Sequence, residues 1–431
     1  MKGTRRFLRL SALAATIVPI AVACAEADVT IGTVVDSPDG GPSVAIPSED
    51  GGATDEDARA PSDASVDADA NEPKPVCSDE GWCHTDVPGG ATLRDVWGDG
   101  SGTVWTVSED GKILRWDGQA WVVAHVAGVP LYAIWGSSPT DLWAGGGTLG
   151  QFAQVLPGVL LHGTGPSPDA LTWTAVVTPM AVRSIWGSSA TDIWAVASLA
   201  HRINRADPSV ILHYAGPTQS EPDAGDAGAP DALANGWSID PISSAFAAHF
   251  EKVWGTSSDD VWVAGRVAPS FGTPAAQLLH FAPDGDGGVA WRKEVPPPPN
   301  VARLDMNGFS LSRNLTVVIG YNGDANSSYL HTGASSDDGA TFTWTQRTAA
   351  ETGFATGSLS AIWGTGPNDL WVGGPRGRLR HWDGSGWQVA AVALDNVMPV
   401  QNAVNAIWGT GPDDIWVVGA DLALHKVKPG T

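Results

Sequence analysis

The sequence has few sulfur-containing and few basic residues. Of 431 residues only 3 are cysteine and 4 are methionine, which excludes a disulfide-dense small protein or a multi-cysteine metal scaffold. Lysine and arginine number 24 against 47 acidic residues, so the formal net charge is −23. Because non-specific nucleic-acid affinity comes from basic side chains that neutralise phosphates, we expect no nucleic-acid partner.

The sequence also lacks motifs that carry a known catalytic mechanism. It contains no H-E-x-x-H pair, no G-x-S-x-G nucleophile turn and no P-loop. From this absence we expect no catalytic residue of these types, no cofactor and no metal site.

Residues 1–24 have the pattern of an export signal. Four basic residues, Lys2, Arg5, Arg6 and Arg9, precede an apolar run from Leu10 to Ala23. This run is shorter than the roughly 20 apolar residues that a membrane-spanning helix needs. We therefore predict a cleaved signal and an extracytoplasmic location.

The end of this signal allows two interpretations. Ala21-Val22-Ala23-Cys24 resembles a bacterial lipobox, which implies a lipid anchor on Cys24, and it also satisfies the A-x-A rule of ordinary cleavage. Cys77 and Cys83 lie close enough in sequence to close a small disulfide loop in an oxidising compartment. That pairing leaves Cys24 for lipidation. The alternatives are an outer-membrane lipoprotein and a secreted protein with a free cysteine.

Residues 25–76 form an acidic segment without sustained apolar periodicity. It carries 13 acidic residues against two basic ones, Arg59 and Lys74. A chain this polar buries too little apolar surface to offset the entropy of ordering. We predict a disordered, self-repelling tether rich in Asp, Ala, Pro and Gly.

From residue 77 onward the chain consists of repeats. Six copies contain two tryptophans eight residues apart, with Gly after the first and, in five copies, Asp two residues before the second. The fixed spacing predicts a rigid two-stranded hairpin. We expect the Gly to permit a positive φ and the Asp to hydrogen-bond turn amides. The tryptophan pairs are Trp97/Trp105, Trp135/Trp143, Trp186/Trp194, Trp254/Trp262, Trp363/Trp371 and Trp408/Trp416.

Each repeat continues with a third and a fourth apolar segment. The third contains a histidine, which we expect to bond a neighbouring turn and not to join a metal ring; the fourth opens with tryptophan. In the fifth repeat Phe309 and the run Val317 to Gly320 replace the tryptophan pair, and His331 is expected to keep the register. The histidines are His162, His213, His280, His331, His381 and His425, with Arg115 in the first repeat.

The last repeat stops after its third segment, at His425. The missing fourth-strand tryptophan is supplied by Trp82 at the other end of the repeat region. These features predict an all-β, seven-bladed β-propeller over residues 77–431, with four strands per blade, closed by an N-terminal strand in the last blade. We expect the tryptophans to form its core, since sugar-binding rings would sit on loops instead of at fixed strand positions.

The repeats resemble bacterial secreted and lipoprotein propellers that share a WG-turn-D-[LIV]-W hairpin. Residues Ser335 to Phe342 also resemble an Asp-box, which implies a turn between third and fourth strands, away from any active site. A sialidase-like enzyme would need an arginine triad and a Tyr/Glu pair. The chain has arginines and four tyrosines, but not in the context of that family.

The variable segments favour a binding function. Loops between second and third strands and connections between fourth and first strands share one face of a propeller, and both vary in length here. The expected binding residues on that face are Arg202, Arg205, Arg266, Phe271, Arg303 and Tyr321. We expect a monomeric, membrane-tethered binding or scaffold module for a protein or glycan. The alternative is a glycan hydrolase or lyase that uses the central pocket.

Overall fold

The computed structural model describes most of the repeat region. The described residues are 77–150, 154–199, 209–217, 233–246, 248–267, 275–284, 286–296, 307–322, 327–347, 352, 358–390, 392 and 399–428. All belong to one compact unit, Asn71–Thr431. The predicted export signal, Cys24 and the segment predicted to form an acidic tether lie outside them.

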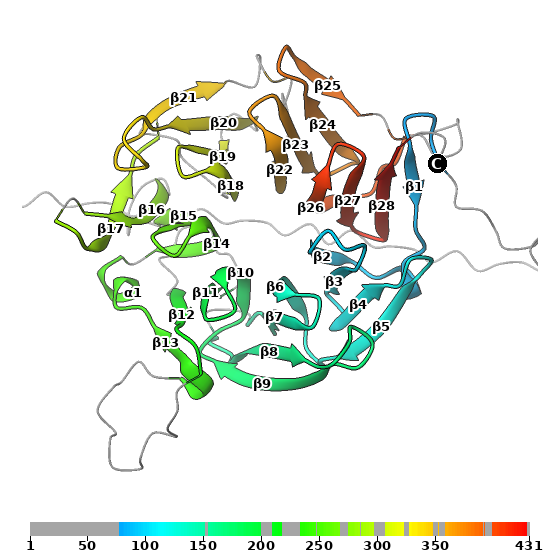
Figure 1. The fold of residues 1–431 in the computed structure, drawn as a ribbon, viewed down its shortest axis with the longest axis horizontal. Coiled ribbons are helices and arrows are strands. Elements are labelled where there is room, and N and C mark those ends of the chain that lie inside the picture. Colours follow the sequence, from blue (N-terminus) through cyan, green and yellow to red (C-terminus); the bar gives the residue numbers. More distant parts are fainter. Residues whose placement is uncertain are drawn as a thin grey trace, which may run out of the picture. The chain divides into compact units, whose positions relative to one another are not determined.

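Seven four-stranded antiparallel sheets surround a common centre, as predicted (Figure 1). Blades one to three comprise β2 (Leu93–Gly98), β3 (Val104–Ser108), β4 (Lys112–Trp116) and β5 (Trp121–Val126); β6 (Leu131–Ser138), β7 (Asp141–Gly147), β8 (Gly158–Thr164) and β9 (Thr172–Thr178); β10 (Val182–Ser189), β11 (Asp192–Ser198), β12 (Ser209–Tyr214) and β13 (Trp237–Ile239). Blades four and five comprise β14 (His249–Ser257), β15 (Asp260–Val267), β16 (Ala275–Pro283) and β17 (Val289–Glu294); β18 (Asn307–Ser312), β19 (Leu315–Asn322), β20 (Ser327–Ala334) and β21 (Thr343–Arg347).

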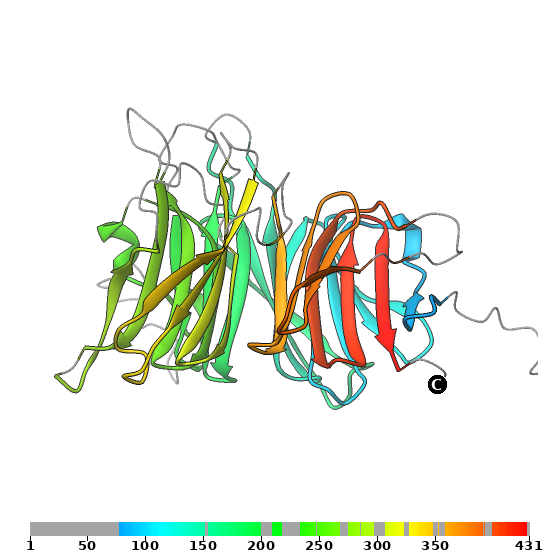
Figure 2. The same cartoon turned by 90° about the horizontal axis from the view of Figure 1, so that it is seen from above.

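The last two blades complete the ring. They comprise β22 (Ala361–Gly366), β23 (Asp369–Gly374), β24 (Arg378–Trp382) and β25 (Trp387–Val389); β26 (Val404–Gly411), β27 (Asp414–Gly419), β28 (Leu422–Val427) and β1 (Trp82–His84). Short helical turns lie at Pro88–Gly90 (η1), Ala234–Gly236 (η2) and Ile242–Ala245 (α1). The first strand of each blade is innermost, and the strands run across the thickness of the ring (Figure 2).

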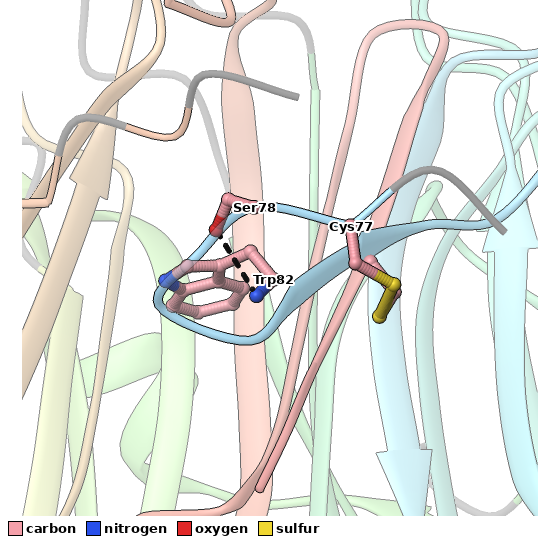
Figure 3. Close-up of a disulfide and its surroundings, with 4 residues drawn as sticks. Cys77, Ser78 and Trp82 are labelled. Atoms are coloured by element: carbon pink, nitrogen blue, oxygen red, sulfur yellow. Dashed lines mark hydrogen bonds between the residues drawn. A yellow bond between two sulfur atoms is a disulfide. The ribbon is translucent and has the colours of Figure 1, made fainter. Parts of the chain in front are cut away.

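The N-terminal strand β1 closes the ring. It pairs antiparallel with β28, with Trp82 opposite Lys426. The Trp82 side chain is 2% exposed and packs edge-on against Trp371 of blade six, with ring centroids 5.5 Å apart. In Figure 3 the segment before this strand turns back on itself: Ser78 Oγ accepts the Trp82 N–H (3.3 Å), and Cys77 is drawn with its disulfide to Cys83. The closure predicted from Trp82 is therefore confirmed.

Five blades share a polar quartet, which we define as a Ser or Thr near the end of the first strand, the Asp and Trp of the second, and the His of the third. The Asp accepts the Ser/Thr hydroxyl on one oxygen, as at Thr410–Asp414 (2.6 Å), and bonds the His on the other. The Asp–His bonds are 2.6–2.8 Å long, in Asp141–His162, Asp192–His213, Asp260–His280, Asp369–His381 and Asp414–His425.

Each histidine of the quartet lies flat on the tryptophan beside it. Their ring centroids are 3.7–4.1 Å apart and their planes lie within 15° of parallel. The same tryptophan receives the fourth-strand tryptophan of the next blade edge-on, at 5.2–6.2 Å. The quartet thus joins one blade to the next. In these five blades the histidines bond the Asp that begins the second strand, next to the turn they were expected to bond. The Asp bonds the histidine and a hydroxyl group in place of the expected turn amides.

The glycine after the first tryptophan has a different role from the one expected. Gly98, Gly136, Gly187, Gly255 and Gly409 do not have positive φ. A Cβ added at any of them would lie 2.5–3.0 Å from the first-strand tryptophan ring of the preceding blade. The glycine is therefore required by close packing, against the preceding blade and, at Gly255 and Gly409, also against the Asp carbonyl of the same hairpin, and not by backbone conformation.

In blade five the histidine of the third strand is displaced by one residue from the position that it has in the five blades with the polar quartet. Val317 pairs with Phe309 and Thr332, so Thr332 and not His331 occupies the register of the quartet histidine. His331 instead points to the other face of the sheet, where it is fully buried and burial lowers its pKa to about 4. The expectation that His331 keeps the register was wrong, because the preceding strand carries no Asp or Trp to hold it.

Candidate functional site

The innermost strands carry a β-bulge near their N-terminal end. The register shifts at Arg94, Tyr132, Arg183, Glu251 and Asn405, each three residues before the first-strand tryptophan. A bulge leaves the extra residue unpaired and re-aims its side chain. All five of these side chains line one pocket at the centre of the ring.

This central pocket has a volume of about 380 Å³ and receives side chains from all seven blades. It lies at the start of the first strands, on the face that carries the fourth-to-first connections and the second-to-third loops. Among these connections, 295–306, 348–360 and 390–403 are the longest by strand bounds. The pocket is lined by Arg94, Asp95, Tyr132, Arg183, Glu251, Lys252, Asn307, Ser358, Leu359, Ser360, Ala361, Ile362, Asn405, Ala406 and Ile407.

Short polar side chains in the pocket are occupied in joining neighbouring blades. Asn405 Nδ2 donates to the Leu93 carbonyl (2.7 Å) and Ser360 Oγ donates to the Val404 carbonyl (2.5 Å). Asn307 Nδ2 donates to the Ser360 carbonyl. These hydrogen bonds hold the inner strands in place and use one donor of each side chain.

Both carboxylates of the pocket are also satisfied. Glu251 Oε1 lies 3.0 Å from His249 Nε2 and 3.9 Å from Arg266 Nη2. Burial acts to raise the pKa of Glu251, but His249 and the nearby arginines outweigh it and lower this pKa to about 2. Asp95 accepts the N–H groups of Val96 (3.0 Å) and Ile134 (3.1 Å). Burial raises the pKa of Asp95, and the charge of Lys252 partly offsets this.

Two cations of the pocket make no hydrogen bond among the described residues, although the charge of Arg183 helps to lower the pKa of Glu251. The Arg183 guanidinium lies over the Tyr132 ring, 4.5 Å from its centroid, and its Nη1 is buried without a hydrogen bond among the described residues. Lys252 makes no hydrogen bond or ion pair in the same part of the chain, although it lies close enough to influence Asp95. The pocket therefore presents two cations to a ligand: Arg183, with one buried donor left unpaired, and the half-buried Lys252.

Of the six expected binding residues, only Arg266 has a described side chain. It is 3% exposed and stands behind the pocket carboxylate of Glu251. Arg202, Arg205, Phe271 and Arg303 lie outside the described residues, as does the side chain of Tyr321, whose backbone lies in β19.

The pocket residues themselves were not singled out from the sequence. A signal existed: within otherwise apolar strands, the position three residues before the first tryptophan is polar in repeat after repeat. Aligning the repeats on the tryptophans would have placed Arg94, Tyr132, Arg183 and Glu251 together. The bulge that turns them toward the centre has no sequence signature that we recognised.

Other site chemistry is not seen in the described part of the chain. No group of three or more His, Cys, Asp or Glu side chains there is arranged to hold a metal ion. Nor does any described helix combine the length and hydrophobicity needed to cross a bilayer.

Comparison with known proteins supports the fold. No protein-family model and no curated protein matches the sequence. Among solved structures, YCF48 from Cyanidioschyzon merolae is similar with a TM-score of 0.53 and 14% identity, over 81% of this chain and 99% of that one. YCF48 bound to a D1 peptide has a TM-score of 0.51 and 16% identity, over 82% and 99%. The WD40 repeats of RRP9 have a TM-score of 0.53 and 10% identity, over 82% and 99%. All are β-propellers.

Proposed function

We propose that this protein is an exported binding module whose partner engages the face around the central pocket, and that the partner presents an acidic group to Arg183 and Lys252. The observation that carries the proposal is that these two cations make no hydrogen bond among the described residues, whereas both carboxylates and the Asn and Ser side chains named above have partners and Arg94 is bonded to Glu109. A buried cationic donor without an acceptor is costly, and a carboxylate would satisfy it.

The shape and lining of the pocket favour a protein partner over a glycan. Leu359, Ile362 and Ile407 supply aliphatic walls, and the Tyr132 ring face is already covered by Arg183. Tyr132 is the one aromatic residue among the described residues that line the pocket, so the ring face that Arg183 covers is not open to stacking by a sugar. The similarity to a propeller solved with a bound peptide is consistent with this preference.

Direct titration tests the proposal. The probes are a fluorescent peptide with an internal Glu, the same peptide with Gln, sialyllactose and lactose. We expect saturable binding of the Glu peptide, at least tenfold weaker binding of the Gln peptide, and loss of binding in Arg183→Gln. Lys293→Gln, an exposed charge on the outer strand β17, serves as the control. Equal binding by Arg183→Gln and wild type would refute the proposal, and selective binding of sialyllactose would assign the site to an acidic glycan.

We also propose that Cys24 carries a lipid and that residues 25–76 form a tether holding the propeller away from the membrane. The support is the basic and apolar pattern of residues 1–24 and the acidic composition that follows. Labelling cells with a fatty-acid analogue should mark the wild-type protein and not Cys24→Ser. Equal label in both would refute the anchor and leave a secreted protein.

One observation keeps an enzyme as the second candidate. Asp95 is a buried carboxyl with a raised pKa in the same pocket as Arg94 and Arg183, and a raised pKa is what a general acid needs. Glu251 does not fit that role at neutral pH, since its pKa is about 2. Hydrolysis or elimination of a bound glycan by wild type, abolished in Asp95→Asn while binding persists, would establish the enzyme.

A further inference from the structure

The junction between blades five and six contains a second cavity, of about 200 Å³. It is lined by residues of both blades and lies apart from the central pocket, with which it shares no residue. Its walls are Leu311, Leu315, Val317, Leu330, Thr332, Arg347, Pro367, Leu370, Trp382 and Trp387.

Four of these residues stand where five of the other blades carry the polar quartet. Leu311 occupies the Ser/Thr position, Leu315 the Asp position and Val317 the Trp position, by the spacing of the repeat. Thr332, opposite Val317, occupies the His position. The whole quartet is thus replaced at once, and all four replacements face the same cavity.

The cavity occupies the place of a missing ring pair. In five blades an indole lies flat on an imidazole at this level and meets the fourth-strand tryptophan of the next blade edge-on. Blade six still supplies that tryptophan, Trp387, but Val317 and Thr332 are much smaller than the indole and imidazole they replace. Trp382 and Trp387, whose rings contact each other with centroids 5.7 Å apart, therefore form an aromatic wall beside unfilled space.

The chemistry of the walls specifies the occupant. Leucine, valine and tryptophan side chains provide an apolar, flat-sided enclosure, and apolar cavities of roughly 150 Å³ bind benzene-sized molecules. The Arg347 guanidinium, also part of the lining, lies 4.8 Å from the Trp382 ring centroid. The Asp that accepts an indole N–H in blades four and six is Leu315 here, so the site offers no carboxylate to a polar ligand.

We propose that this cavity is a binding site for a small, neutral, planar aromatic compound, of a size up to a bicyclic ring. Such a ligand would take the place that the indole takes in the sister blades, stacked between the sheets and edge-on to Trp387. The site is independent of the central pocket and of the partner proposed for it.

Titration of the full chain with indole tests this proposal, by calorimetry and by thermal melting. We expect saturable binding and a ligand-dependent rise in melting temperature for the wild type. Val317→Trp rebuilds the ring of the sister blades and should abolish both responses. Leu311→Phe narrows the same cavity with a smaller change in side-chain volume and should weaken indole binding at least tenfold. If Val317→Trp folds poorly, Leu311→Phe is the variant to compare with the wild type.

The controls make the outcome decisive. Val177→Trp places the same ring on the exposed fourth strand of blade two and should leave indole binding unchanged. No binding of indole to the wild type up to its solubility limit would overturn the proposal. Indole binding that persists undiminished in Val317→Trp or Leu311→Phe would place the ligand elsewhere and overturn it equally.

Discussion

At the scale of single residues, the sequence predicted positions more reliably than interactions. The Asp two residues before the second tryptophan and the His of the third strand were both expected to be structural. Their direct bond, such as Asp260–His280 at 2.7 Å, was not predicted because the two residues are far apart in the repeat. Strand register brings them together, and register depends on the whole hairpin.

The packing role of the repeat glycine leads to a matched prediction. A Cβ at Gly409 would lie 2.4 Å from the Asp414 carbonyl oxygen and 3.0 Å from the Trp363 ring, whereas one at Gly411 would meet nothing within 4 Å. We expect Gly409→Ala to lower the free energy of unfolding by about 1–3 kcal/mol through overpacking. Gly411→Ala should leave it nearly unchanged. Urea unfolding measures both, and an equal effect of the two substitutions would contradict the account.

The Asp–His pairs predict a dependence of stability on pH. The pKa values of Asp141 and Asp414 are lowered below 3.8 in the folded protein. The largest cause is the hydrogen bond that each carboxylate accepts from its histidine, His162 or His425. A carboxyl with a lowered folded-state pKa stabilises the fold above its unfolded pKa and loses this contribution as the pH falls through the folded value.

The double variant Asp141→Asn/Asp414→Asn tests this dependence. The urea midpoint of the wild type should be higher than that of the double variant from pH 7 down to about pH 4. Below about pH 4 the difference between the two midpoints should shrink progressively. A difference that stays constant down to pH 2 would show that the carboxylate charge is not what matters.

At the scale of the blade, the sequence predicted the hairpin of the first two strands but neither the β-bulge in the first strand nor the displaced histidine of blade five. Fixed tryptophan spacing predicted every first and second strand outside blade five. The bulge that turns Arg183 and Glu251 into the central pocket was not predicted, because it is a property of the pairing between two strands and no residue type in the first strand marks it. The slip at His331 was missed for a similar reason, since only pairing with β19 reveals which face it occupies.

A tryptophan in a fully packed junction between blades should contribute more to stability than a tryptophan that lines the cavity between blades five and six. Trp254 is 4% exposed, and its Nε1 donates to Ser310 Oγ (3.1 Å) in the next blade. We expect Trp254→Ala to lower the free energy of unfolding by about 3–5 kcal/mol. Trp382→Ala, beside the cavity between blades five and six, should lower the free energy of unfolding by clearly less. Chemical denaturation compares them, and the reverse order would contradict the packing argument.

At the scale of the whole molecule, the number of blades and the closing strand followed from counting. Seven fourth-strand tryptophans, one of them Trp82 before the first blade, require the two ends of the repeat region to meet. In the structure this contact consists of β1 on β28, Thr85 Oγ1 donating to the Ala423 carbonyl (3.0 Å), and Trp82 packed on blade six. The binding face, by contrast, was only partly predictable, since the central pocket combines residues from seven repeats.

The ring closure is the claim on which the blades, the central pocket and the junction cavity all depend. It is tested most directly by comparing the urea midpoint of a chain lacking residues 1–84 with that of a chain lacking residues 1–70, which keeps β1. Without Trp82 and its strand, we predict a loss of at least about 3 kcal/mol in the free energy of unfolding, restored in part by a synthetic peptide spanning residues 77–84. Equal midpoints for the two chains would show that β1 does not close the ring.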